Sequence, residues 1–143
     1  MREAAGAGPA SPTMLNPKLK AKMPNEDQNQ KPKVYDLEER TAKFAENVII
    51  LVIKLTNDPV NRPIINQLIR SSGSIGANYM EADAAESKKD FRHKIAICKK
   101  EAKETRHWLR LLSTANPECL QGCRKLWQEA QELLLIFSAI LKK

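Results

Sequence analysis

The stretch from Ser87 to Leu112 carries an unbroken heptad pattern of apolar and small residues. The recurring positions, separated by alternating steps of four and three residues, are Phe91, Ile95, Cys98, Ala102, Thr105, Leu109 and Leu112. This spacing places them on one face of an α-helix, as a seam that packs against other helices. Ser87 and Asp90 have the spacing of a capping box, which predicts that the helix begins here. The rest of the chain is therefore expected to form a helical bundle around this segment.

Basic residues form a second stripe on the same helix, beside the apolar seam. The basic stripe consists of Lys88, Arg92, Lys99, Lys103, Arg106 and Arg110. No acidic residue falls among them, because Asp90, Glu101 and Glu104 lie on the opposite flank. Like charges three or four residues apart destabilise a helix by about 0.2–0.5 kcal/mol per pair. Three interpretations are open: an acidic strip on a neighbouring helix or subunit, a polyanion such as nucleic acid, or a solvated surface.

The basic character of the chain is local rather than general. The whole chain has 24 Lys and Arg against 17 Asp and Glu, but residues 88–114 alone hold nine basic and three acidic side chains. Residues 1–34 contain five of the eight prolines and no apolar periodicity, which predicts a disordered tail followed by one domain over residues 35–143. Three cysteines and no apparent secretory or membrane-spanning segment favour the cytoplasm.

Three further helices are predicted around the central one. The first extends from about Asp36 to Thr56, with Asp36 as its N-cap. Asn61 is expected to cap the second, with Pro63 in its first turn, and the fourth is expected to begin near Pro117. Short connections force neighbouring helices to be antiparallel. The predicted fold is therefore all-α, an up-down-up-down four-helix bundle.

The first predicted helix contains an apolar run from Val48 to Ile53. Such a run is also compatible with a buried strand, but the helical spacing on both sides favours a helix. A helix that is apolar all round must be covered all round. We therefore expect Ile49, Ile50 and Ile53 to form an interface with another subunit of a homo-oligomer.

Small residues interrupt the second predicted helix between Ser71 and Asn78. Glycine and serine at this position indicate either a break or a close approach between helices. A phosphate-binding loop is the third alternative, but the stretch lacks the lysine and the preceding strand of that motif. Close helix packing is the favoured interpretation.

Metal and catalytic sites are not predicted. Cys98, Cys119 and Cys123, together with His93 and His107, raise the possibility of zinc. The antiparallel fold, however, is expected to separate Cys98 from the other two cysteines, and cysteine in a helix seam usually acts as a small apolar residue. No nucleophile lies beside a base in the predicted arrangement. We predict no catalytic residues, no cofactor and no metal.

Three segments carry a resemblance to a known family. They read VYDLEERTAKFAENVI, INQLIRSSGSIGANYMEA and KKDFRHKIAICKKEAKETRHWLRLL. The chain resembles the bacterial 23S rRNA intervening-sequence proteins over about residues 34–142, and the Ser-Ile-x-Ala-Asn-x-x-Glu pattern from Ser74 to Glu81 is the most specific part. The family commonly has Glu-Gly where this chain has Glu81-Ala82.

The resemblance implies a four-helix bundle without established catalytic activity. It also implies a relation to the accessory variability proteins of diversity-generating retroelements, which form barrel-shaped homopentamers and bind a reverse transcriptase and nucleic acid. We therefore expect a non-enzymatic homo-oligomer, a pentamer by resemblance, that binds RNA or DNA largely independently of sequence. The alternative is an interaction scaffold, for example an accessory subunit of a reverse transcriptase.

Overall fold

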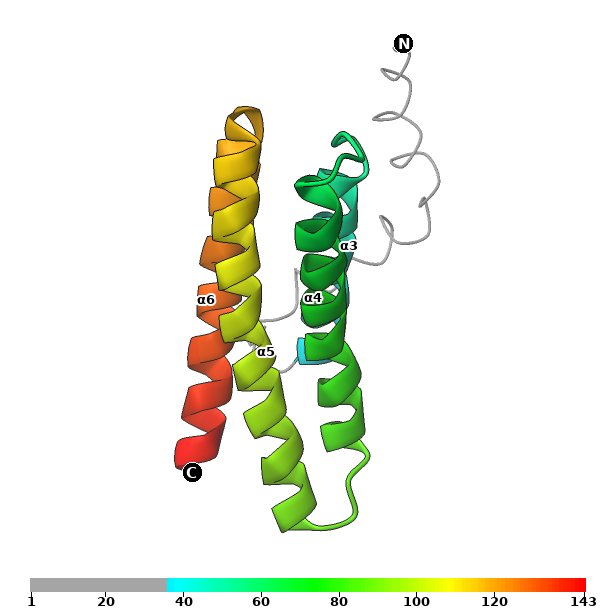
Figure 1. Ribbon diagram of the computed structural model, residues 1–143. Coiled ribbons are helices and arrows are strands. Elements are labelled where there is room, and N and C mark those ends of the chain that lie inside the picture. The colour runs from blue at the N-terminus through cyan, green and yellow to red at the C-terminus, as the bar shows by residue number, and fades with distance from the viewer. Residues whose placement is uncertain (1–35) are drawn as a thin grey trace, which may run out of the picture. The chain divides into compact units, whose positions relative to one another are not determined.

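The computed structural model describes residues 36–143, which form an all-α unit with no strand (Figure 1). Its elements are α3 (Leu37–Val52), α4 (Asn61–Asp83), α5 (Lys88–Ala115), the short 3-10 helix η2 (Pro117–Cys119) and α6 (Leu120–Lys142). The predicted tail, residues 1–34, lies outside the described residues. None of the helices in 36–143 is long and apolar enough to cross a bilayer.

Consecutive α-helices run antiparallel, as the colours of Figure 1 allow the reader to follow. Helix α5 packs along both α4 and α6, whereas α3 lies against α4 and has fewer contacts with α6. The all-α, four-helix prediction is confirmed. Helix α5, around which the bundle was predicted to form, is thus the helix with the most extensive packing against its neighbours.

The heptad seam of α5 is the side of that helix that enters the core. Six of its seven members are buried and Phe91 is half-buried. The large side chains that complete the core from the other helices include Phe44, Leu68 and Phe137, all nearly inaccessible to solvent. Burial of each such side chain stabilises the fold by about 1.5–3 kcal/mol relative to its exposure.

The helix boundaries confirm some predictions and correct others. Helix α5 begins as predicted, because the Ser87 hydroxyl accepts a hydrogen bond from the Asp90 amide at 3.0 Å. Asp36 precedes α3, but its side chain makes no capping hydrogen bond. Helix α3 also ends at Val52 rather than Thr56, since the chain turns before residues 57–58.

Asp58, not Asn61, caps the start of α4. One carboxylate oxygen of Asp58 accepts hydrogen bonds from the amides of Val60 at 3.0 Å and Asn61 at 2.7 Å. The predicted capping role of Asn61 is therefore wrong. The Asn61 side chain instead turns inward, where it is almost completely buried.

A reciprocal amide pair joins the start of α4 to the end of α5. Asn61 Nδ2 donates to Asn116 Oδ1 at 3.1 Å, and Asn116 Nδ2 donates to Asn61 Oδ1 at 2.8 Å. Both residues are buried, so bulk water cannot take over the hydrogen bonds if one of the two amides is removed.

Substitution Asn61→Leu is expected to lower the free energy of unfolding by about 1–3 kcal/mol, because it leaves the buried Asn116 amide without a partner. Urea denaturation measures this loss. A double-mutant cycle with Asn116→Leu should show strong coupling between the two positions. Simple addition of the two single losses would contradict the importance of the pair.

The small residues of α4 allow close packing, as favoured from the sequence. The helix is continuous from Asn61 to Asp83. Thr105 of α5 donates to the Ser71 hydroxyl at 2.9 Å, and a Cβ atom on Gly76 would lie 3.0 Å from Thr41 Oγ1 of α3. Small side chains therefore bring α4 close to both neighbours, and the interpretation as a phosphate-binding loop is wrong.

Candidate nucleic-acid interface

The basic stripe lies along the edge of α5 that borders α6. Five of its six side chains are exposed, and Arg106 is half-buried. Two contacts place this edge beside α6. Arg92 Nη2 donates to the carbonyl oxygen of Leu141 at 2.8 Å, and Arg106 Nη1 donates to Gln131 Oε1 at 2.5 Å.

Two carboxylates of α6 face away from this edge. Glu129 and Glu132 both pair with Arg40 of α3, at 2.7 Å and 2.8 Å. Hydrogen bonding to Glu129 is the largest factor that raises the pKa of Arg40. These acidic side chains therefore neutralise a cation on the α3 side of the unit.

The acidic flank of α5 is likewise paired away from the stripe. Arg70 of α4 binds Glu101 at 3.3 Å and also pairs with Glu104. The Trp108 indole donates to Glu104 at 2.8 Å, and this hydrogen bond, followed by Arg70, holds the pKa of Glu104 below its ordinary value. The acids of α5 thus serve the α4–α5 contact.

The basic stripe has no neutralising partner among the residues that the structure describes. Among residues 36–143, no carboxylate lies within ion-pair distance of any of its six members. The helices α3, α4 and α6 therefore supply no acidic strip that neutralises these side chains. The alternatives of a partner subunit, a polyanion or solvent around the stripe stay open.

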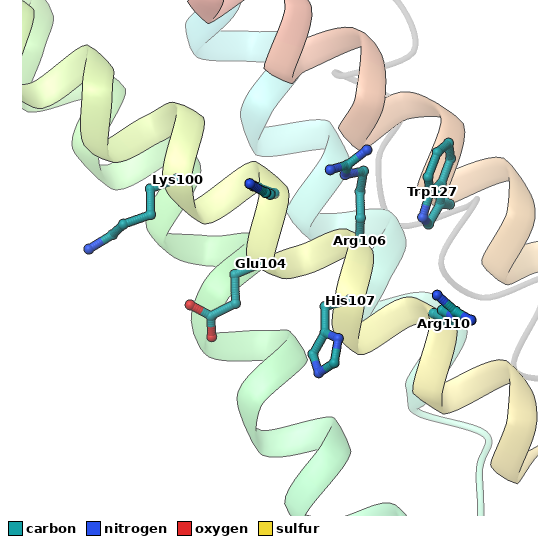
Figure 2. A pocket seen from close by; sticks show the side chains of 7 residues that line it. Lys100, Glu104, Arg106, His107, Arg110 and Trp127 are labelled. Carbon is teal, nitrogen blue, oxygen red and sulfur yellow. The ribbon is translucent and has the colours of Figure 1, made fainter.

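A groove of about 530 Å³ opens at the middle of the stripe, between α5 and α6 (Figure 2). It is lined by Lys100, Lys103, Glu104, Arg106, His107, Arg110 and Trp127. The guanidinium carbon of Arg106 lies 5.1 Å from the centre of a Trp127 ring, within range of a cation–π interaction. Figure 2 shows the Trp127 ring beside Arg106 at the α6 edge, with Arg110 nearby and His107 directed elsewhere.

Sequence reasoning missed the contribution of α6 to this groove. The sequence assigned no binding role to Trp127, yet 36% of it is exposed. Gln131, one turn further along, fixes Arg106. The sequence does contain a signal for the groove. It is a tryptophan beside the apolar face of α6 combined with arginines beside the apolar face of α5 that have no acidic neighbours.

The predicted interface residues form an exposed apolar patch on α3 and α4. Ile49, Ile50 and Ile53 are 47%, 50% and 76% exposed. A smaller groove of about 290 Å³ lies beside Ile49 and Ile53 and is continued on α4 by Ile65 and Ile69. We call these residues, Ile49, Ile50 and Ile53 together with Ile65 and Ile69 of α4, the α3/α4 apolar patch. No other part of residues 36–143 covers its exposed side.

The cysteines do not gather into one site. Cys98 donates to the carbonyl oxygen of Ile75 at 3.4 Å, whereas the sulfurs of Cys119 and Cys123 lie 3.7 Å from each other. Burial raises the pKa of Cys98 and of Cys123 to about 12, so both thiols are protonated at neutral pH. In the described part of the chain, no group of three or more His, Cys, Asp or Glu side chains is placed to hold a metal ion.

Comparisons with known proteins agree with this fold. The family model described as 23S rRNA-intervening sequence protein matches residues 33–139. The chain is also similar to a protein of unknown function from the S23 ribosomal protein family of Bacteroides thetaiotaomicron, with 31% identity and a TM-score of 0.70. The match covers 78% of this chain and 99% of the crystallised one. A comparison with curated proteins finds no match.

Proposed function

This chain belongs to the 23S rRNA-intervening sequence protein family, and from this membership and the geometry of α5 we propose that it is a non-enzymatic protein that binds RNA or DNA through the basic stripe. The observation that carries the proposal is the row of six cations that no carboxylate of residues 36–143 neutralises. Phosphates would supply the missing counter-charges and release condensed cations on binding. The free thiols Cys98, Cys119 and Cys123 fit a cytoplasmic setting.

The length of the stripe suits an extended polyanion. Lys88 and Arg110 are separated by about 33 Å along the helix, at about 1.5 Å per residue. A nucleic-acid strand presents roughly one phosphate per 3.4 Å over that distance. Lysine and arginine contacts to phosphate position a strand without reading its bases, so binding should depend little on sequence.

Binding is expected to weaken steeply with salt. If all six cations contact phosphates, the slope of log K against log salt is about −5 for duplex DNA and about −4 for single strands. An increase from 50 to 200 mM salt should therefore reduce duplex affinity by roughly 10³-fold. Titrations with RNA, single-stranded DNA and duplex DNA at both salt concentrations measure this. Absence of binding, or an affinity that ignores salt, would contradict the proposal.

We also propose that the protein is a homo-oligomer assembled through the α3/α4 apolar patch, with five subunits as the family resemblance implies. The support is the exposure of Ile49 and Ile50, near the end of α3, and of Ile53, directly after it. Contiguous apolar patches of this kind on a protein surface usually mark an interaction site.

A second candidate function is an interaction scaffold, and the same apolar patch favours it. Its partner would be another protein, such as the reverse transcriptase that the resemblance implies. Affinity capture before and after nuclease treatment separates the two functions. A direct protein contact survives the treatment, whereas a contact bridged by nucleic acid is lost.

A further inference from the structure

We propose that the groove between α5 and α6 holds an unpaired base of a single-stranded nucleic acid, stacked against Trp127. This inference rests on the proposed function and adds a substrate class to it. Trp127 lies in a groove whose other lining includes Lys103, Arg106 and Arg110 of the basic stripe. An exposed tryptophan surrounded by cations is the combination with which proteins bind single strands.

The groove is chemically suited to a base flanked by phosphates. Of its lining residues, only Glu104 carries a negative charge, and that carboxylate is already engaged by Arg70 and the Trp108 indole. No acidic side chain is therefore free to repel a strand there. The exposed third of Trp127 offers an aromatic surface that a duplex, with its bases already stacked and paired, has no means to use.

Arg106 packs against the Trp127 ring and holds a positive charge beside the proposed stacking surface. Its guanidinium lies over the Trp127 ring at 5.1 Å and is held by Gln131. The Nε atom of Arg106 is buried and has no acceptor among the described residues. Packing and one neutral amide thus hold the guanidinium of Arg106 in position, and no carboxylate of residues 36–143 pairs with it.

The neighbouring cations define how a strand would run. Lys103 and Arg110 are two turns apart, about 10.5 Å along α5 at about 1.5 Å per residue. A strand stacked as in a duplex covers this distance with roughly three nucleotides at 3.4 Å each, and a more extended strand covers it with fewer. A strand that follows α5 can therefore contact both side chains through its phosphates while one base between them turns toward α6 and Trp127.

The test compares an oligothymidylate with an abasic strand of equal length, which has the same phosphates and no bases. The unmutated chain should bind the base-bearing strand roughly 5- to 150-fold more tightly, the range expected for one stacked base. Trp127→Ala should remove this preference, so that the two strands bind with equal affinity, while Trp127→Phe should retain part of it. Trp108→Phe is the matched control, because Trp108 does not line the groove and Glu104, which loses the indole donor in this variant, keeps its ion pair with Arg70.

Fluorescence gives a second readout that does not require Trp127 to be replaced. The chain has two tryptophans, so in the Trp108→Phe variant only Trp127 emits. Oligothymidylate should quench this emission and the abasic strand should not. Equal affinity of the unmutated chain for both strands, or absence of quenching, overturns the stacking site while the phosphate-binding function stands. Binding of neither strand also overturns the stacking site, and the phosphate-binding function falls with it only if RNA and duplex DNA fail to bind as well.

Discussion

Replacing Lys99 and Lys103 together by glutamate is expected to reduce affinity for duplex DNA by roughly 50- to 100-fold at 0.1 M salt. The loss of two phosphate contacts accounts for about this factor, and the new negative charges add to it. The slope of log K against log salt should become shallower by about 2. Both side chains are exposed and make no ion pair within residues 36–143, so the fold should be preserved.

A matched control changes the same charge elsewhere. Lys54 and Lys125 are also exposed, but they lie off the basic stripe, after α3 and on α6. Their replacement by glutamate should change duplex affinity by only a few-fold, through the long-range field of the protein. Light scattering on both variants checks that their assembly state is unaltered. Equal losses for the two variants would show that net charge, and not the stripe, governs binding.

Replacing Ile49 and Ile53 by aspartate is expected to dissociate the proposed oligomer into single chains of 16.1 kDa. Both side chains are exposed in the single subunit, so the substitution should not disturb its core. Burying two unpaired carboxylates in an apolar interface is strongly unfavourable. Light scattering coupled to size exclusion measures the mass of each variant.

The control for this prediction uses apolar residues outside the α3/α4 apolar patch. Met80 and Leu135 are 54% and 55% exposed, comparable to Ile49 and Ile50. Their replacement by aspartate should leave the oligomer intact. A single-chain mass for the unmutated protein would overturn the proposed assembly.

Most of the fold was readable from helical periodicity. The seam of α5 repeats over seven positions, and such a long pattern identifies both the helix and its buried side. Helix starts were less predictable. Asp58 and Asn61 are both good capping residues, and only the three-dimensional turn decides that Asp58 caps α4 while Asn61 joins Asn116 in the interior.

The part of the candidate site that lies on α5 alone could be predicted from the sequence. The part that is formed by α5 and α6 together could not. Helical spacing identifies the basic stripe because all six members belong to α5. The groove depends on the register between α5 and α6, which places Trp127 and Gln131 opposite Arg106. That register follows from the packing of both seams and from the 3-10 turn between the helices, and neither is encoded in a short sequence motif.

Within residues 36–143, the sorting of charge described above gives the unit an uneven distribution of charge across its width. Glu129 and Glu132 lie toward α3, Glu101 and Glu104 toward α4, and the unpaired cations along the far edge of α5. In the field of a polyanion, a molecule with this polarity rotates so that its positive edge leads before any contact is made. Association should therefore be fast at low ionic strength, with few unproductive collisions, and should slow as the Debye length shrinks.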